Sequence, residues 1–213
     1  MDDIFSFWSG LSEEEARIHP RDKNVLSRVN NPFEHSCFAE PFRGRLKTAP
    51  VVLLFLSPGL HDRDLSAQTQ EHAYYSRQRE GHCDLPTEHE HQTARIWATK
   101  VVKQFEIDYE TARSKIAVLN VSPYRSKSFN DWHLLAALPS ARVTLDWAQT
   151  VLFSEAEEDK RIVVCLRSSA YWGLDRTTKF GRSLYAPKCT RGGMMVLGGD
   201  RDEIVSAVKR AIL

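Results

Sequence analysis

The sequence lacks a long apolar run, an excess of charge of either sign and any Cys-x-x-Cys pair. No apolar stretch approaches the roughly 18 residues of a membrane-spanning helix, so we expect no membrane span. The 29 basic and 28 acidic residues leave a net charge of +1, which gives no global argument for nucleic acid but is compatible with a local basic groove. The four cysteines are widely spaced, and the first residues do not have the basic-then-apolar layout of a secretory leader. We therefore expect a cytoplasmic protein with reduced thiols.

The length and the absence of linkers indicate one domain. The 213 residues are enough for a sizeable core, and no internal repeat or low-complexity tract divides them. We predict a single α/β domain over residues 1–213, with residues 1–40 as an N-terminal extension packed on it. Within this extension, Ser12 and the acidic residues Glu13–Glu15 are typical of a helix start.

Short apolar runs alternate with helical patterns along the rest of the chain. A continuous apolar run that ends at turn-forming residues is typical of a strand buried on both faces. Such runs cover residues 51–56, 116–121, 161–166 and 194–197. Helical patterns fall between and after them, over residues 93–105, 132–137, 140–154 and 201–213. We predict a three-layer α/β/α fold with a four-stranded, mainly parallel sheet.

The residues that follow the strands are the first place to look for chemistry. In open α/β sheets, ligands bind outside the carboxyl ends of the strands, and right-handed crossovers bring those ends to one edge. After the first run, Pro58 cannot donate to a strand ladder, and Gly59 permits a tight turn or the close approach of a ligand. The residues predicted to gather at this edge are Ser57, Pro58, Gly59, Asn120, Ser122, Tyr124, Arg125, Arg167 and Ser168.

These motifs resemble the uracil-DNA glycosylase superfamily. In that family a central strand ends in an Asp-Pro or Asn-Pro-Gly turn, and residues 51–60, Val-Val-Leu-Leu-Phe-Leu-Ser-Pro-Gly-Leu, are similar to it. Val118-Leu119-Asn120 is similar to the strand whose Asn reads the flipped base, and residues 162–170 are similar to a later strand and helix start. The resemblance covers roughly residues 41–213 in order and spacing, and it implies a uracil-DNA glycosylase-like fold.

The chain also resembles a group of uncharacterised bacterial proteins. Those proteins have a Pro-Phe-x-Gly motif, a Leu-Asn-Pro-Gly motif and a Pro-Tyr-His-Ser motif. The corresponding segments here are Pro41-Phe42-Arg43-Gly44, Leu56-Ser57-Pro58-Gly59 and Pro123-Tyr124-Arg125-Ser126.

Two positions depart from the glycosylase pattern. Ser57 stands where the family has the Asp or Asn that activates or positions water, and a neutral serine cannot take a proton from water without a nearby base. The loop that matches the family's His-Pro-Ser reads Leu197-Gly198-Gly199-Asp200 and has no His. We therefore predict that Ser57, with His61 or Asp62, would orient water. A solvated polar loop is the alternative interpretation of residues 61–64.

Each predicted binding residue also has a structural alternative. Asn120 can hydrogen-bond a base edge or cap the next turn. Tyr124 can stack on a base or pack into the core, and Arg125 can hold a phosphate or be a surface charge. Arg167 would hold phosphate, and Ser168 is predicted at the same edge of the sheet. For both residues the alternative is a helix cap. The predicted binding set is Pro58, Gly59, Asn120, Tyr124, Arg125, Arg167 and Ser168.

A His-rich loop invites a metal interpretation. Imidazole and thiolate suit zinc, but the spacing of these side chains matches no closed four-ligand pattern. We favour a polar loop and predict no metal and no cofactor, and we keep a metal-dependent hydrolase as a third hypothesis. The residues concerned are His82, Cys83, His89 and His91.

The leading hypothesis is a uracil-DNA glycosylase-like protein that binds a nucleobase or nucleic acid, with altered or residual N-glycosidic hydrolysis. Its expected partners are DNA, a nucleobase or a nucleotide. The alternative is a non-catalytic nucleotide or small-molecule binding module on the same fold. The sequence leaves the oligomeric state open, and it leaves open whether the protein is an enzyme.

Overall fold

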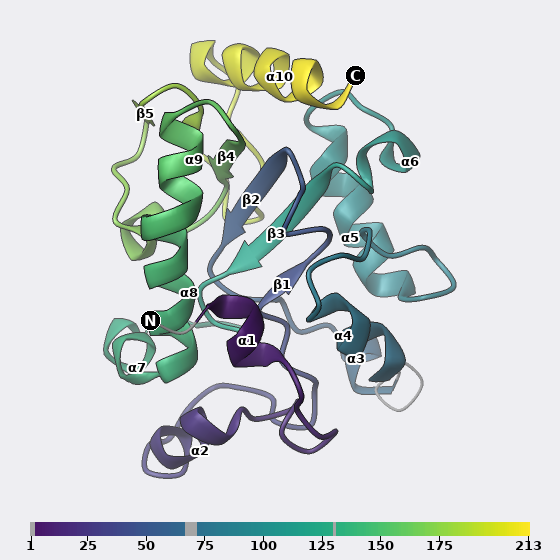
Figure 1. Cartoon of the computed structure of the whole chain (residues 1–213), viewed down its shortest axis with the longest axis vertical. Coiled ribbons are helices and arrows are strands. Elements are labelled where there is room, and N and C mark those ends of the chain that lie inside the picture. Colours follow the sequence, from purple (N-terminus) through teal and green to yellow (C-terminus); the bar gives the residue numbers. More distant parts are fainter. Residues whose placement is uncertain (1–2, 67–71, 130) are drawn as a thin grey trace.

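A central sheet organises the structure. The computed structural model describes residues 3–66, 72–129 and 131–213. Four of the strands run parallel in the middle, and a short antiparallel strand pairs at each edge (Figure 1). The six strands lie in the order β1 (Phe42–Arg43), β3 (Ile116–Asn120), β2 (Val51–Phe55), β4 (Ile162–Cys165), β6 (Leu184–Ala186) and β5 (Thr178–Phe180).

The central strands are apolar on both faces because helices cover both faces. In β2 all five residues are buried, and successive side chains point to opposite sides of the sheet. Val52 and Leu54 belong to one core, and Val51, Leu53 and Phe55 belong to the other. This arrangement explains why the strand is a continuous apolar run and not an alternating one.

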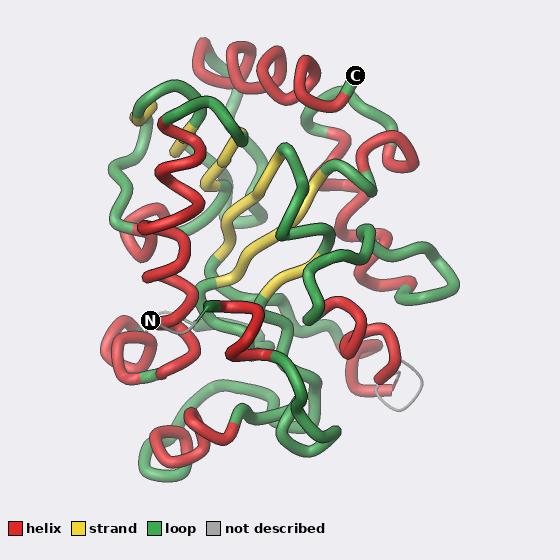
Figure 2. The backbone as a smooth tube through the Cα atoms, viewed as in Figure 1, coloured by secondary structure: helices red, strands yellow, loops and turns green. Residues whose placement is uncertain are grey.

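The helices form a layer on each face (Figure 2). One layer contains α1 (Ile4–Trp8), α2 (Pro20–Leu26), α7 (Trp132–Ala137), α8 (Pro139–Trp147), the π-helical turn η1 (Ala148–Leu152) and α9 (Phe153–Glu157). The other contains α5 (Gln92–Lys103), α6 (Tyr109–Ala112) and α10 (Gly199–Ile212). The remaining helical segments are α3 (Asp62–Ser66), α4 (His72–Gln78) and the 3-10 turn η2 (Ser169–Trp172). Among the described residues, none of the helices combines the length and the apolar character needed to cross a bilayer.

The α/β class is confirmed, but the predicted four-stranded sheet is wrong because the sheet has six strands. Residues 194–197 do not form the predicted fourth strand; only Met195 makes an isolated bridge, with Cys189. Val196 and Leu197 are 42% and 84% exposed, and Met195 is the residue of this run that packs in the core. The fourth parallel strand is β6, which pairs with β4. The four predicted helices correspond to α5, α7, the continuous run α8-η1-α9, and α10.

The predicted helix start at Ser12 produces a turn and not a helix. Ser12 and Glu15 exchange side-chain hydrogen bonds, from the Ser12 N–H to the Glu15 carboxylate (2.9 Å) and from the Glu15 N–H to the Ser12 hydroxyl (3.3 Å). His19 then has an extended ψ of 133° because Pro20 follows it, and α2 begins at Pro20. The N-terminal segment still packs on the sheet, since Phe7 and Trp8 are buried in the same core as Leu54.

Candidate functional site

A cavity of about 610 Å³ opens at the carboxyl ends of the central strands, between the sheet and α5. The chain leaves β2 towards β3 on one side and later reaches β4 on the other side, so β2 stands at the switch point of the sheet. Register places Phe55, the last residue of β2, beside Asn120, the last residue of β3. Residues from the loops after β2, β3 and β4 all line the cavity.

The wall formed by α5 and β2 is aromatic and apolar. Trp97 of α5 is half-buried and meets Phe55 edge to face, with ring centroids 5.1 Å apart. The guanidinium of Arg43 lies 5.6 Å from the centroid of the Trp97 ring. Further apolar lining comes from Ile96 and Met194. Such a wall can stack against a planar ligand, because aromatic faces attract both π-systems and cations.

A buried ionic network forms the base of the cavity. Arg43 and Arg125 are 6% and 5% exposed, and both pair with the Glu40 carboxylate. Arg125 donates to Glu40 Oε2 at 2.9 Å, to the Gly59 carbonyl at 2.9 Å and to Asp64 Oδ2 at 3.4 Å. Two guanidinium groups thus meet two carboxylates, so the network carries no net charge.

The network keeps both guanidinium groups charged. Burial disfavours the charged form of Arg125, but Tyr75, Glu40 and Asp64 favour it, and the pKa of Arg125 is raised. The pKa of Arg43 is likewise raised, because Glu40 outweighs the cost of burial. These charges are therefore fixed parts of the site across the physiological pH range.

His91 and Tyr75 extend the network toward α5. His91 Nδ1 accepts from the Ala94 N–H (3.3 Å) at the start of α5, so a neutral ring carries its proton on Nε2. That nitrogen lies 2.8 Å from the Tyr75 hydroxyl, which also accepts from Arg125 at 2.9 Å. Burial and the charges of Arg43 and Arg125 lower the pKa of His91 to about 2, so the ring stays neutral.

The two carboxylate oxygens of Asp64 differ in their contacts. Oδ2 accepts from the His61 N–H at 2.7 Å and from Arg125, and Oδ1 is buried with no hydrogen bond to any described residue. Asp64 lines the cavity and is 6% exposed. A buried oxygen without a donor is unusual and suits a ligand or a water molecule at this point.

Basic side chains from α5 and from the loop after β4 lie at the cavity. Arg167 is half-buried and lines the cavity, and burial together with the positive charge of Arg191 lowers the pKa of Arg167. Lys100 of α5 also lines the cavity and is exposed. Within the described part of the chain, none of these three side chains forms an ion pair with a carboxylate. The net charge of the whole protein conceals this local basic rim.

Seven of the predicted site residues line this one cavity, and they come from the end of β3 and from the segments that follow β2, β3 and β4. Their roles stay predictions, although their proximity matches the expectation that strand ends meet at one edge. Asn120 is held in place because its Nδ2 donates to the Glu40 carbonyl at 3.0 Å. The seven residues are Ser57, Pro58, Gly59, His61, Asn120, Arg125 and Arg167.

Three predicted residues lie outside the set that lines the cavity. Tyr124 is 1% exposed in the core, where its hydroxyl donates to Asp22 Oδ2 at 2.6 Å, so its ring is not placed to stack on a ligand there. The Asp62 side chain is 88% exposed and lies 3.9 Å from Lys127. Ser168 has a left-handed backbone (φ 58°) and precedes η2 without a side-chain cap bond. The acid that reaches the cavity from this loop is Asp64, two residues beyond Asp62.

Arg125 is neither a free phosphate ligand nor a surface charge. Its guanidinium is committed to Glu40, Asp64 and Tyr75, so it supports the base of the cavity. Glu40, Arg43 and His91 belong to the site and are not among the predicted site residues. The Pro-Phe-x-Gly motif contains Arg43 and follows Glu40 directly, and the His-rich loop contains His91.

The His-rich loop does not converge on a metal. His91 is turned into the Tyr75 network, and His82 lies 3.3 Å from the Lys47 ammonium group. Over residues 3–66, 72–129 and 131–213, no group of three or more His, Cys, Asp or Glu side chains is arranged to hold a metal ion.

Comparison of the chain with protein-family models, with curated proteins and with solved structures found no match in any of the three.

Proposed function

We propose that the cavity binds a nucleobase carried by a nucleotide or a nucleic-acid strand. The observation that supports this most directly is that an aromatic pair, Trp97 with Phe55, lines the same cavity as two cations, Arg167 and Lys100. Neither cation pairs with a carboxylate among the described residues. A planar base would stack on the wall, and its phosphate would lie on the basic rim. Asn120 would read the edge of the base, because an amide can both donate and accept.

We further propose that the associated activity is hydrolysis of an N-glycosidic bond, with Asp64 as the group that activates water. Asp64 would take a proton from water, whose oxygen then bonds to the sugar carbon. The carbon–nitrogen bond breaks, and the base leaves with the bonding electron pair and accepts a proton. Ser57 would orient the water. This role is supported by the position of Asp64 in the lining of the cavity and by its Oδ1, which accepts no hydrogen bond from the described residues.

The second candidate is binding without hydrolysis. This candidate is favoured by Ser57, which follows the end of β2 by two residues. Its neutral hydroxyl cannot replace a carboxylate as a base. The contacts of Asp64 also favour binding without hydrolysis, because its Oδ2 already accepts hydrogen bonds from the His61 N–H and from Arg125.

One experiment separates the candidates. DNA strands that contain uracil, hypoxanthine or a mismatch are tested for binding and for base release at two salt concentrations. Three variants are compared with the wild type. Asp64→Asn tests the activation of water, Trp97→Ala tests the stacking of the base, and Arg167→Ala tests the binding of the phosphate. Matched controls are Trp132→Ala, an exposed tryptophan on α7, and Arg142→Ala, an exposed arginine on α8.

We expect Trp97→Ala to weaken binding by about 1–3 kcal/mol, the usual value of one stacked base. Arg167→Ala should weaken binding and flatten its salt dependence, since fewer counterions are released. Base release that is lost in Asp64→Asn supports hydrolysis, and binding without release supports the second candidate. The proposal is wrong if the wild-type protein neither binds the DNA strands nor releases a base from them. It is also wrong if the two control variants weaken binding as much as the cavity variants do.

A further inference from the structure

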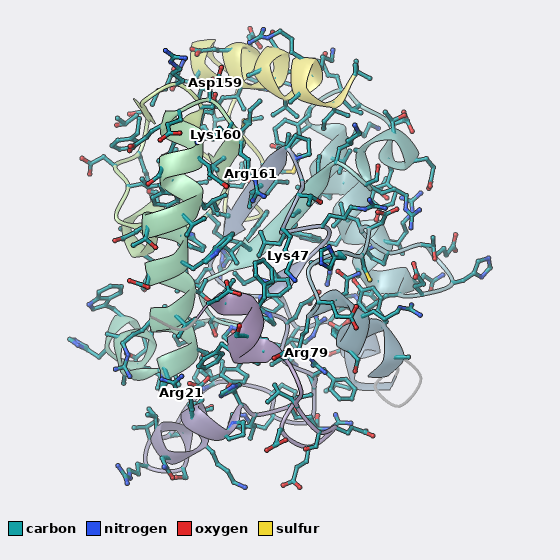
Figure 3. The ribbon with its side chains drawn as sticks, in the orientation of Figure 1. Arg21, Lys47, Arg79, Asp159, Lys160 and Arg161 are labelled. Atoms are coloured by element: carbon teal, nitrogen blue, oxygen red, sulfur yellow. The ribbon has the colours of Figure 1, made fainter. Side chains whose placement is uncertain are left out.

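A second cavity of about 610 Å³ lies between α1, the segment that follows α1, and the C-terminal end of α4. It shares no lining residue with the cavity at the strand ends. Lys47 and Arg79 both line it, and Figure 3 labels the two cations between α1 and α4. Two basic side chains from distant parts of the sequence thus meet at a cavity that the proposed function does not use.

Arg79 is buried and has no carboxylate partner among the described residues. It is 6% exposed, its Nη2 donates to the Ser76 hydroxyl at 3.3 Å, and its Nη1 has no hydrogen-bond partner in the described part of the chain. Arg43 and Arg125 are equally buried, yet each pairs with a carboxylate. Burial of an unpaired charge is costly, which is why buried arginines are almost always paired. Among the described residues, Arg79 thus lacks the anionic partner that Arg43 and Arg125 have.

Two more donor residues line the same cavity as Arg79. The indole Nε1–H of Trp8 is buried and has no acceptor among the described residues. The ammonium group of Lys47 is exposed, and within the described chain it contacts the imidazole of His82 (3.3 Å) and the Phe5 ring (4.8 Å) but no carboxylate. Two cations and an unused N–H donor make a set that can surround an anion with several acceptor oxygens.

Carboxylates also line this cavity, but they do not neutralise the cations. Asp3 and Glu80 are exposed lining residues, and neither lies within 4.0 Å of the Arg79 or Lys47 nitrogens. Arg79 directly follows α4, whose carbonyl end favours a cation. The interaction with the helix end offsets only a fraction of the free-energy cost of burying an arginine. It also gives Nη1 no hydrogen-bond acceptor among the described residues.

We propose that the second cavity binds the phosphate group of a phosphorylated small molecule, with Arg79 as its anchor and Lys47 as the second cation. A phosphomonoester carries a charge of about −1.5 to −2 near pH 7 and offers three strong acceptor oxygens, which matches two cations and several N–H donors. A cavity of about 610 Å³ is within the usual size range of small-molecule sites, so the phosphate would be part of a larger molecule.

The indole N–H signals of the tryptophans give a readout that is specific to this site. Inorganic phosphate and phenyl phosphate are titrated into ¹⁵N-labelled protein, with sodium chloride at matched ionic strength as the control. The Trp8 signal is assigned by its loss in Trp8→Phe. We expect both phosphates to move the Trp8 signal saturably, phenyl phosphate at the lower concentration. Binding at the first cavity would instead move the signal of Trp97, so failure of one proposal is distinguishable from failure of the other.

The deciding variant is Arg79→Met, and the matched control is Arg28→Met, an exposed arginine on the surface. We expect the apparent affinity for phosphate at Trp8 to fall at least tenfold in Arg79→Met and to be unchanged in Arg28→Met. The remaining signals of the spectrum show that the variant is folded. A Trp8 signal that chloride moves as much as phosphate, or that phosphate moves equally in Arg79→Met and wild type, would overturn the proposal. If phenyl phosphate binds no better than inorganic phosphate, the site does not take a phosphorylated molecule.

Discussion

Removal of the Glu40 charge tests the buried network most directly. Glu40 is 2% exposed and is the shared carboxylate of Arg43 and Arg125. In Glu40→Gln the side chain keeps its size, but Arg43 loses its carboxylate partner entirely. Arg125 keeps only Asp64, at 3.4 Å, as an ionic partner.

The expected loss follows from burial. Breaking a buried ion pair by removing one partner costs about 3–5 kcal/mol, because the remaining charge is left without compensation. A domain has only about 5–15 kcal/mol of stability, so this is a large part of the total. With a typical urea dependence for the free energy of unfolding, the midpoint should fall by roughly 1–2 M.

Urea unfolding of the wild type, Glu40→Gln and Glu13→Gln checks the reasoning. Glu13 also pairs with an arginine, Arg17, at 3.2 Å, but its side chain is 54% exposed. That control should lose no more than about 1 kcal/mol, the usual value of an exposed pair. Adding Arg43→Met to Glu40→Gln should restore part of the loss, since it removes the uncompensated charge. A loss below about 1 kcal/mol in Glu40→Gln would refute the uncompensated-charge argument.

Two further predictions concern His91 and Tyr124. The pKa of His91 falls from 6.5 to about 2 on folding, so its contribution to stability is complete above pH 6.5 and is lost as pH falls toward 2. His91→Gln should therefore flatten the acid side of the stability profile, by up to about 1.4 kcal/mol per pH unit below pH 6.5; parallel profiles from urea unfolding at several pH values would contradict this. Tyr124→Phe removes the donor to the buried Asp22 and should cost about 1–3 kcal/mol of stability. It should leave oligonucleotide affinity unchanged, which unfolding and binding measured on one preparation would establish.

The central strands could be predicted from sequence because burial on both faces requires an apolar side chain at every position. Residues 51–55, 116–119 and 162–165 meet that requirement, and they lie within β2, β3 and β4. The outer strands could not be found this way. β1 has two residues and β6 has three, and both exist only because a neighbouring strand offers hydrogen bonds. Residues 194–197 show the reverse error, since an apolar run alone does not ensure that a strand has a partner.

The location of the site followed from topology, but its chemistry did not. The rule that strand ends converge placed Ser57, Asn120 and Arg167 together. The partners of Arg125 could not be foreseen, because Glu40 lies 85 residues away and Tyr75 lies 50 residues away in sequence. Tyr124, next to Arg125, points into the core instead. Neighbours on an irregular loop have no fixed periodicity, so the face that each one presents depends on tertiary packing.

The short outer strands have a consequence for how the protein behaves when it is concentrated. A sheet can recruit another chain only through the free amides and carbonyls of its outermost strands, and long flat edges are the usual starting point for aggregation. Here β1 and β5 offer two and three residues. Arg43 places a charge within β1, and Lys179 of β5 is exposed and pairs with Glu203. The very apolar β2 is thus separated from other molecules by at least one strand on each side, and its tendency to self-associate is confined to the unfolded chain.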